Sequence, residues 1–457
     1  VMAAIIDTGI AGNDKPYIFQ MSGKLIALGL IGLVCSITAQ YFSAKAACGC
    51  AAKLKNALFE KMQAMTFTEM DHVGASTMIN RMTTDVNQVQ TGINMVLRLF
   101  LRSPFIVFGA MIMAFTVNAK AALVFVVVIP VLSVIVFGIM LVTIPLYKNV
   151  QGQLDNVLEK TRENLAGIRV IRAFGKEEEE IREFEARNNA LTRFQQYVGK
   201  ISALMNPVTY VVINIAIAVL IYVGAIQVNV GILTQGAVVA LYNYMSQILV
   251  ELIKLANLII TMTKSAASAQ RIETIFKVSK GKKEIEILPE GNTEAKVVFD
   301  HVTLAYENAG ENTLTDIDFI VNSGDTIGII GGTGSGKTSL VHLIPGFYPV
   351  KQGAVYVDGK NVKSYEEGEL RDKIGIVMQK SVLFKGTIRE NMLWGNENAT
   401  DEEIIQAIET AQGKDILEKK ENGLDEEIEQ GGRNLSGGQK QRLCIARALV
   451  RKPEILI

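Results

Sequence analysis

The stretch Gly331-Gly332-Thr333-Gly334-Ser335-Gly336-Lys337-Thr338 decides how the second half of the chain folds. It follows the apolar run Thr326–Ile330, which predicts a short strand, and it precedes Ser339-Leu340-Val341, the apolar start of a helix. Glycines let the backbone curl until its N–H groups face an anion, and the helix N-terminus adds a favourable dipole. Between a strand and a helix, the spacing G-x-x-x-x-G-K-T predicts a phosphate-binding loop.

Two side chains of this loop have chemistry of their own. Lys337 would reach the β- and γ-phosphates of a nucleotide, and the Thr338 hydroxyl would coordinate Mg²⁺. The loop therefore predicts ATP and Mg²⁺ as cofactors. Its expected nucleotide-binding residues are Gly331, Gly332, Thr333, Gly334, Ser335, Gly336, Lys337, Thr338 and Ser339.

A second anion-binding segment lies about a hundred residues further on. Leu435-Ser436-Gly437-Gly438-Gln439 precedes Lys440–Val450, a run of strong helix formers, so its hydroxyl and amides would again face a phosphate at a helix N-terminus. Only the first of the two segments carries a lysine. This division favours a dimer in which each segment completes a site on another subunit.

The first half of the chain contains long segments without Asp, Glu, Lys or Arg. A bilayer span needs about 20 apolar residues, so the longest segment, with fifty residues, suits two spans joined at Asn229–Gly236. Val1–Ile10 would be the tail of an earlier span, which gives part of a first span and five whole ones. Buried helices of a soluble protein are the alternative, and so many long runs in one chain disfavour it. The uncharged segments are 25–44, 103–119, 121–147 and 201–250.

Two charged stretches, 45–102 and 148–200, separate the spans. Both have helical periodicity, and each would run out and back as two helices of about 25 residues, reaching about 40 Å. Their many Lys and Arg residues favour the cytoplasmic side, whereas the opposite loops, 116–121 and 225–236, are short and carry one charge. The stretches would act as levers that transmit movement from a cytoplasmic domain.

One pair of charges falls inside the last predicted span. Glu251 and Lys254 are three residues apart and so share a helical face. Charges in hydrocarbon usually face a partner or a watery cavity. The pair would therefore either line a substrate path or form a structural couple, and the sequence leaves both readings open.

The overall composition excludes some classes of function. Lys and Arg together number 46, as do Asp and Glu, so nothing points to nucleic acid as a partner. The cysteines show neither a disulfide framework nor the usual C-x-x-C spacing of metal sites, and the histidines form no ligand pair. These residues are Cys35, Cys48, Cys50, Cys444, His72, His301 and His342.

Three regions follow from these patterns. Residues 1–280 form the transmembrane domain, with its last long helix ending at Arg271-Ile272-Glu273. Residues 281–295 form a polar linker, and residues 296–457 form the nucleotide-binding domain. The chain begins and ends within apolar runs, so we expect it to be truncated at both ends.

The chain resembles an ATP-binding cassette (ABC) exporter half-transporter of the multidrug- and lipid-exporter type, and the resemblance covers essentially its whole length. It implies an all-α transmembrane bundle followed by an α/β P-loop ATPase domain with antiparallel β and α-helical subdomains. It also implies that Tyr306 stacks on adenine and that Gln379, after the predicted strand Ile374–Met378, senses Mg²⁺ as a catalytic-site residue. Ser436, Gly437, Gly438 and Gln439 would bind the nucleotide held by the partner subunit.

Two departures from the family pattern matter. The Walker B strand of the family ends in Asp followed by a catalytic Glu, and here Ile455-Leu456-Ile457 ends the chain before either carboxylate. Where the family often has Glu-Arg-Gly before the signature, this chain has Gln430-Gly431-Gly432, a variant that favours a heterodimer over a homodimer.

The resulting hypothesis is ATP-driven export of a small amphipathic compound (a drug, lipid or peptide) across the plasma membrane by a dimer whose nucleotide-binding domains are cytoplasmic. The alternative is an ATP-binding regulatory or gating subunit with a degenerate hydrolytic site. A soluble chromosome-maintenance ATPase shares both phosphate motifs, but the membrane spans argue against it. Met205, Met245 and Met262 would suit a lipid-like substrate, although ordinary helix packing explains them as well.

Overall fold

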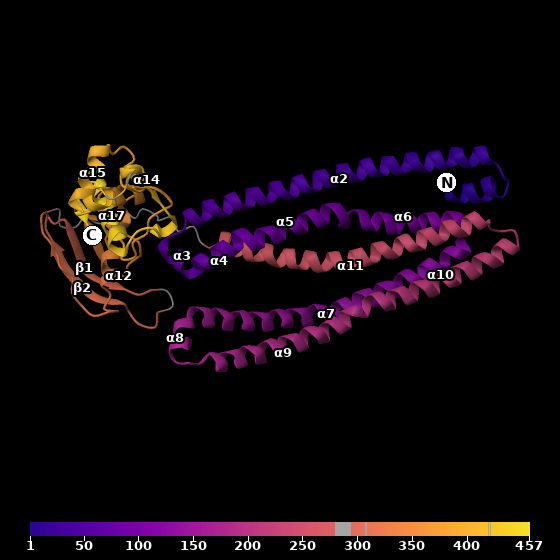
Figure 1. Cartoon of the computed structure of the whole chain (residues 1–457), viewed down its shortest axis with the longest axis horizontal. Helices are drawn as coiled ribbons and strands as arrows, with labels where there is room; N and C mark the ends of the chain where they lie inside the picture. Colours follow the sequence, from indigo (N-terminus) through magenta and orange to yellow (C-terminus); the bar gives the residue numbers. More distant parts are fainter. Residues whose placement is uncertain (279–293, 307–308, 419, 421) are drawn as a thin grey trace. The chain divides into compact units, whose positions relative to one another are not determined.

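The computed structural model describes residues 1–278, 294–306, 309–418, 420 and 422–457, and the chain forms two compact units (Figure 1). The first comprises Val1–Lys61 and Ser76–Lys277, and the second comprises Met62–Ala75 and Val278–Ile457. The second unit thus includes a short segment from the helical half, which a single boundary near residue 280 does not anticipate. The predicted linker, 281–295, falls outside the described residues except for its last two.

Helices make up the described part of the first unit. Five helical stretches among the described residues are long and apolar enough to cross a membrane, namely Lys15–Gln63, Ala75–Val117, Ala119–Ala166, Glu177–Asn229 and Gln235–Leu255. The predicted α-helical bundle is confirmed. Its elements are α1 (Met2–Ala4), η1 (Ile5–Ile10), α2 (Lys15–Gln63), α4 (Ala75–Asn80), η2 (Arg81–Asp85), α5 (Val86–Met95), η3 (Val96–Phe100), α6 (Arg102–Val117), α7 (Ala119–Ala166), α8 (Ile168–Ala173), α9 (Glu177–Ala203), α10 (Met205–Asn229) and α11 (Gln235–Lys277).

The charged stretches between the spans continue the same helices. Helix α2 extends to Gln63, α7 to Ala166, and α9 starts at Glu177, so these parts of the charged stretches are helical, as their periodicity predicts. The last long helix, α11, ends at Lys277 rather than at the predicted Glu273, because its helical hydrogen bonding continues through another turn.

Small side chains allow the helices of the first unit to approach closely. Helix α11 lies along α5 and α6, and α7 lies along α9 and α10 (Figure 1). Ala114, Ala121 and Ala122 are completely buried at these crossings. A Cβ atom on Gly92 of α5 would lie 2.0 Å from the Ser265 hydroxyl of α11, so glycine alone permits this crossing. Small residues let backbones meet in hydrocarbon, where packing rather than the hydrophobic effect associates helices.

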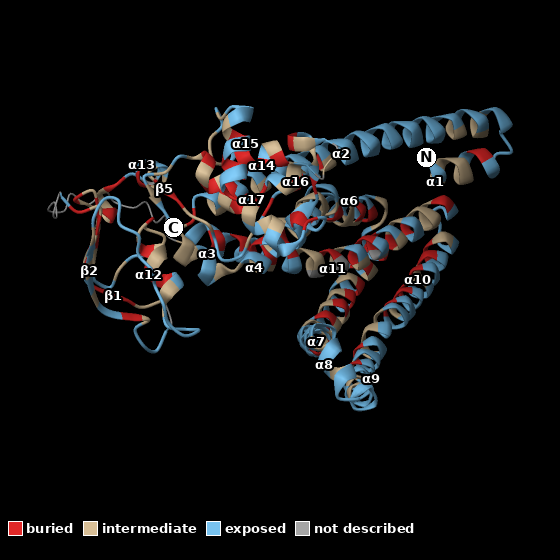
Figure 2. Ribbon diagram, turned by 60° about the vertical axis from the view of Figure 1, so that its left-hand side comes forward, coloured by how far each residue is buried: buried red, intermediate tan, exposed pale blue. Residues whose placement is uncertain are grey.

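Helix α2 presents its apolar side chains outward. None of its most apolar window is buried within the chain, and Figure 2 shows the helix largely in the colour of exposed residues. The exposed side chains include Leu28, Leu30 and Ile31. A surface of this kind is stable against hydrocarbon or against another apolar surface.

The second unit contains the predicted α/β domain. Four strands form an antiparallel sheet in the order β2-β1-β3-β4, and β5 pairs with β8 in parallel. Its elements are α3 (Phe67–Val73), β1 (Val297–Leu304), β2 (Leu314–Val321), α12 (Lys337–Leu343), β3 (Gln352–Val357), β4 (Lys360–Asn361), η4 (Val362–Ser364), α13 (Glu367–Asp372), β5 (Ile374–Gly375), β6 (Gly386–Thr387), α14 (Ile388–Leu393), α15 (Asp401–Thr410), α16 (Lys414–Glu418), η5 (Gly423–Asp425), β7 (Glu427–Ile428), η6 (Gln430–Gly432), α17 (Gly437–Val450) and β8 (Ile455–Leu456).

Two hydrophobic cores stabilise this unit. In the sheet core, the Phe299 ring stacks on Phe319 with 4.6 Å between ring centroids. In the helical core, Ile388, Ile404 and Leu443 from three different helices are completely buried. The fully buried side chains contribute about 1.5–3 kcal/mol each, so the antiparallel sheet and the helical subdomain each have a core of their own.

The expected strand at Thr326–Ile330 is not formed. No described strand forms hydrogen bonds with this segment. Ile330 is 98% exposed, so its apolar side chain is not packed against the described part of the chain either. The strand predicted at Ile374–Met378 is also shorter, since β5 ends at Gly375, although the Val377 amide still donates to the Ile457 carbonyl at 2.8 Å.

Candidate nucleotide site

Glycines shape the phosphate loop at the points where the backbone must turn. Gly334 and Gly336 have φ angles of 84° and 85°, in the left-handed region that side chains disfavour. A Cβ atom on Gly336 would lie 2.7 Å from Leu314 Cδ2 and 3.2 Å from the Thr313 carbonyl. Helix α12 can therefore start at Lys337 because its N-cap residue has no side chain.

The Lys337 ammonium lies against the loop that precedes it. Its Nζ atom donates to the carbonyls of Gly331, at 2.8 Å, and Gly332, at 2.7 Å. A cation is thus fixed beside the backbone amides of the loop and the start of α12. This combination of ammonium and amide donors fits the phosphates of a nucleotide.

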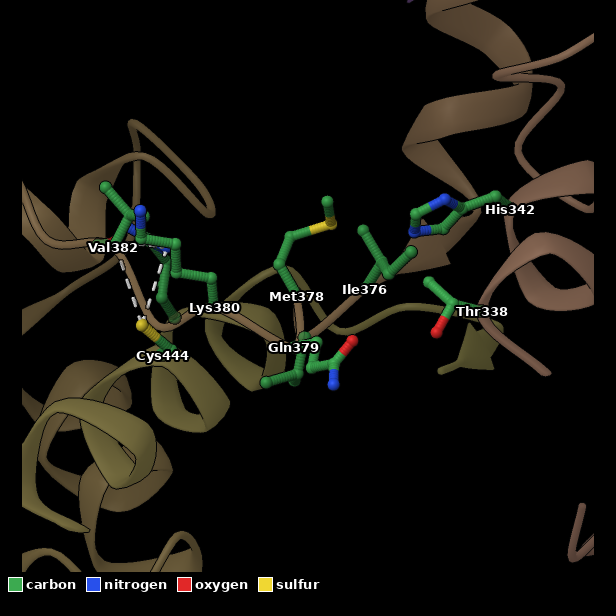
Figure 3. Close-up of a pocket in the computed structure, with 10 residues that line it drawn as sticks. Thr338, His342, Ile376, Met378, Gln379, Lys380, Val382 and Cys444 are labelled. Atoms are coloured by element: carbon green, nitrogen blue, oxygen red, sulfur yellow. Dashed lines mark hydrogen bonds between the residues drawn. The ribbon is translucent and has the colours of Figure 1, made fainter. Parts of the chain in front are cut away.

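A cavity of about 660 Å³ brings Thr338 and Gln379 together (Figure 3). Thr338 comes from the first turn of α12, and Gln379 lies four residues after the end of β5, the strand that pairs with β8. In Figure 3 the two side chains face the same space. The two residues predicted to meet the metal ion, 41 positions apart in the sequence, both line this cavity.

The donor atoms of this cavity fit Mg²⁺. Thr338 offers a hydroxyl oxygen and Gln379 an amide oxygen, which are hard ligands of the kind that Mg²⁺ prefers. Among the described residues no group of three or more His, Cys, Asp or Glu side chains could hold a metal ion. A Mg²⁺ ion held by these two oxygens would also take phosphate oxygens of a nucleotide as ligands, which is how Mg²⁺ usually binds at phosphoryl-transfer sites.

Sequence reasoning missed several side chains that line the same cavity. His342 lies four residues after Thr338 on α12, so the helical repeat alone could have placed it on the same face. Cys444 and Arg447 come from α17, and no local pattern shows that this helix reaches the cavity. Burial lowers the pKa of His342 and raises that of Cys444. The complete lining is Thr338, His342, Ile376, Val377, Met378, Gln379, Lys380, Val382, Cys444 and Arg447.

The lowered pKa of His342 predicts that acid destabilises the second unit. Because its folded pKa lies below the unfolded value of 6.5, the unfolded chain takes up a proton first. The stability from neutral His342 is therefore present above pH 6.5 and is lost as the pH falls through the folded pKa. We expect the urea midpoint, followed by the fluorescence of Trp394, to fall between about pH 7 and pH 5, and to fall less in His342→Gln.

His301 provides the matched control. Asp316 holds its pKa above 6.5, so its contribution is present at low pH and is lost as the pH rises through the raised value. His301→Gln should therefore steepen the loss of stability in acid. Identical slopes for the wild type and His342→Gln would contradict the assignment.

Tyr306 lies beside the phosphate loop as well. Its hydroxyl donates to Ser339 Oγ at 2.9 Å, and its ring meets Tyr348 edge to face with 5.0 Å between centroids. Ser339 is buried in α12 directly after Thr338. The residue expected to contact adenine is thus anchored to the loop expected to hold the phosphates.

The signature segment caps helix α17. Ser436 is the N-cap residue, and its Oγ accepts from the Gln439 amide at 3.3 Å while Gln439 Oε1 accepts from the Ser436 amide at 2.9 Å. Gly437 and Gly438 form the first turn. None of these four residues lines the cavity at Thr338, so the structure does not join the two phosphate-binding segments in one site.

The charged pair in the last span has a third member. Glu251 is 2% exposed and accepts from Lys254 Nζ at 3.0 Å and from Ser103 Oγ of α6 at 2.7 Å. The Lys254 side chain is 46% exposed. Ser103 lies 148 residues away in the sequence, so no local pattern could indicate its role.

Comparison with known families agrees with this arrangement. The family model described as the ABC transporter transmembrane region matches residues 1–252, and the model described as ABC transporter matches residues 314–457. The chain is an ABC transporter. Its membrane domain is fused to an ATPase domain that couples ATP hydrolysis to transport. It is a multi-pass membrane protein with a cytoplasmic nucleotide-binding domain, and the predicted resemblance to ABC exporters is confirmed.

Individual relatives cover nearly the whole of this ABC transporter. It is 33% identical to the uncharacterized ABC transporter ATP-binding protein YfiB of Bacillus subtilis, over all of this chain and 80% of that protein. It is 27% identical to the ATP-dependent lipid A-core flippase of Yersinia pestis, over all of this chain and 78% of the flippase. The structure of a bacterial Atm1-family ABC exporter with ATP bound has the same fold, with a TM-score of 0.80, 21% identity, and coverage of 99% of this chain and 80% of that one.

Proposed function

We propose that this ABC transporter chain is one half of a dimer that exports a small amphipathic compound, such as a drug, lipid or peptide, across the plasma membrane. The main support for this proposal is that its two phosphate-binding segments do not line the same cavity. Lys337 and Thr338 lie at one site, whereas Ser436–Gln439 cap a helix end that does not line the same cavity. A second subunit would supply the missing segment to each site.

The proposed roles follow from the positions of the side chains. Lys337 and the loop amides would hold the phosphates, the oxygens of Thr338 and Gln379 would hold Mg²⁺, and the Tyr306 ring would face adenine. Bound Mg²⁺ would neutralise charge that develops on the phosphoryl group. Ser436 and the first-turn amides of α17 would approach the γ-phosphate from the partner subunit.

We also propose that the partner is a different chain. At Gln430-Gly431-Gly432, both glycines have positive φ angles, 69° and 66°. An arginine at position 431, as in many family members, would be strained in this conformation, so the loop before the signature is specialised for glycine. Isolation of the transporter through a tag on this chain should yield a second half-transporter in equal amount, and a single species would instead indicate a homodimer.

The amphipathic substrate is supported by the apolar helical surface and by a relative named as a lipid A-core flippase. The test is ATP-dependent accumulation of a fluorescent amphipathic probe in inside-out vesicles that contain the complete transporter. We expect accumulation with ATP and none with a non-hydrolysable analogue. Nucleotide binding without turnover or accumulation would overturn the proposal in favour of a regulatory or gating subunit.

Glu251 and Lys254 are proposed to line the substrate path, with the amine held beside the buried carboxylate. Glu251→Gln and Lys254→Met should each change the profile of transported probes and reduce turnover by roughly fivefold or more, because removing one partner leaves a charge uncompensated. Thr263→Val, which removes a hydroxyl bonded only within its own helix, is the matched control. An unchanged profile and turnover in both variants would leave a structural couple as the explanation.

A further inference from the structure

The segment that carries Gln379 crosses from one hydrophobic core of the nucleotide-binding unit to the other. At its start, the Val377 amide donates to the Ile457 carbonyl at 2.8 Å. Further on, Leu383 is buried in the helical core. Among the described residues, the main chain of 378–381 forms no hydrogen bond with another main-chain group. The position of Gln379 therefore depends on how the two ends of this short segment are held.

Arg447 holds the far end of the segment. Its Nη2 atom donates to the Val382 carbonyl at 3.1 Å, and the Cys444 sulfur lies 3.7 Å from the same oxygen (Figure 3). All three residues line the cavity that contains Gln379. Hydrogen bonds from a charged donor are stronger than neutral ones, so the guanidinium is the main anchor of the Val382 carbonyl.

The helix that carries this anchor is itself firmly packed. Leu443 and Ala446, on either side of Cys444 in α17, are completely buried in the helical core. A Cβ atom on Gly395 would lie 2.3 Å from the Arg447 carbonyl oxygen, so the main chain of α17 is closely covered at this residue. The end of the segment is thus fixed to a rigid element of the helical core.

The same guanidinium has a donor to spare. Arg447 Nη1 is buried and has no hydrogen-bond partner in the described part of the chain. An unpaired donor in the interior is costly, especially on a charged group, so stability alone does not account for this side chain. A guanidinium carries five donors in a planar fork, so it can hold the Val382 carbonyl and still bind a second acceptor.

We propose that Arg447 is a positioning residue, which fixes the end of the segment at Val382 and so holds the Gln379 amide oxygen where it can bind Mg²⁺. This inference rests on the proposed function, in which Gln379 is a metal ligand. Arg447 does not touch the ion and acts only through the main chain between Gln379 and Val382. Removing an outer partner of a metal ligand typically lowers metal affinity by about 10–100-fold.

Arg447→Met tests the proposal, because it keeps a long apolar stem and removes the donors. In the complete transporter, the affinity for a non-hydrolysable ATP analogue is measured once with Mg²⁺ and once with EDTA. The ratio of the two affinities reports what the metal ion contributes. We expect this ratio to fall about tenfold, the lower end of the effect of an outer partner. The affinity in EDTA should stay close to the wild-type value, whereas a general distortion of the site would lower both affinities.

Hydrogen exchange without nucleotide gives a second measurement that does not involve the metal ion. In Arg447→Met, the amides of 377–383 should exchange faster, because one anchor of the segment is lost. Arg442→Met is the matched control. Arg442 lies on the same helix and also donates to a main-chain carbonyl, that of Gln412 at 2.7 Å, but it does not line the cavity. It should speed exchange near Gln412 and change neither the 377–383 amides nor the ratio.

Gln379→Ala connects the two residues. It should lower the ratio at least as much as Arg447→Met, and the double variant should be no worse than Gln379→Ala, since Arg447 acts through Gln379. If Gln379→Ala lowers the ratio and Arg447→Met does not, or if the two effects add fully, only the inference about Arg447 is wrong. If Gln379→Ala leaves the ratio unchanged, the proposed role of Gln379 fails and the inference falls with it.

Thermal unfolding of each variant in detergent identifies any that does not fold. Arg447→Gln then replaces Arg447→Met, because glutamine is polar but shorter than arginine and cannot reach the Val382 carbonyl from the same backbone position. A wild-type ratio in Arg447→Gln would overturn the inference. None of these measurements requires transport, so a wild type without ATP-dependent accumulation would contradict the export proposal and leave the test of Arg447 intact.

Discussion

Lys337→Ala should reduce ATP hydrolysis by about 100-fold or more, since removing a single fixed donor from a charged transition state commonly costs that much. The Nζ atom is held beside the loop by the carbonyls of Gly331 and Gly332, so the cation is already oriented toward the loop amides. No other side chain of the loop carries a positive charge. The measurement is phosphate release by the complete transporter at saturating ATP.

Lys351→Ala is the matched control for this prediction. Lys351 is a lysine of the same unit whose Nζ atom donates to Asn312 at 3.0 Å on the surface. Its loss should change turnover by less than about twofold, because exposed contacts of this kind contribute little. If Lys337→Ala retained more than about a tenth of the activity, the role assigned to Lys337 would be wrong.

Gly353→Ala should destabilise the nucleotide-binding unit by about 2–5 kcal/mol. Gly353 has a φ angle of 76°, which costs other residues about 1–2 kcal/mol. A Cβ atom would also lie 2.3 Å from the carbonyl oxygens of both Asp300 and His301. These are backbone atoms at the point where the register between β1 and β3 shifts, so relief requires moving a strand, at a further cost of about 1–3 kcal/mol.

The single tryptophan of the chain makes this measurement local. Trp394 stacks on Phe384 within the nucleotide-binding unit, so its fluorescence in urea reports that unit. Gly368→Ala is the control, since an added Cβ atom there meets nothing within 4 Å and should be neutral or stabilising by up to about 1 kcal/mol. Equal urea midpoints for Gly353→Ala and Gly368→Ala would show that the backbone where β1 pairs with β3 can move to accommodate the added Cβ atom.

Features with a local physical cause were predictable from the sequence. The phosphate loop has its glycines, lysine and threonine within eight residues, and the apolar spans follow from length and charge alone. The helix expected after the loop begins at Lys337, and five apolar helical stretches are found among the described residues. The helix that follows the signature begins at Gly437 rather than at Lys440, because Ser436 and Gln439 cap each other and so bring the glycines into the first turn.

Features that depend on contacts between distant segments were not predictable. The apolar pattern at Thr326–Ile330 has the composition of a strand, but a strand also needs a partner, and no described strand pairs with it. Ser103 meets Glu251, and Cys444 reaches the cavity, only because the helices cross there. The Thr66 and Glu69 spacing could have marked the start of α3, yet nothing local showed that this helix belongs to the nucleotide-binding unit.

The placement of α3 also has a consequence for biosynthesis. The Tyr348 hydroxyl donates to Asp71 of α3, the two are separated by 277 residues, and α3 leaves the ribosome first. At about 5–20 residues per second, the Phe347 and Tyr348 rings that contact α3 are made only some 15 to 55 s later, after the remaining membrane helices. During that interval Phe67 has no ring to stack on. The α3 segment must therefore stay undocked until the residues around Tyr348 have been synthesised.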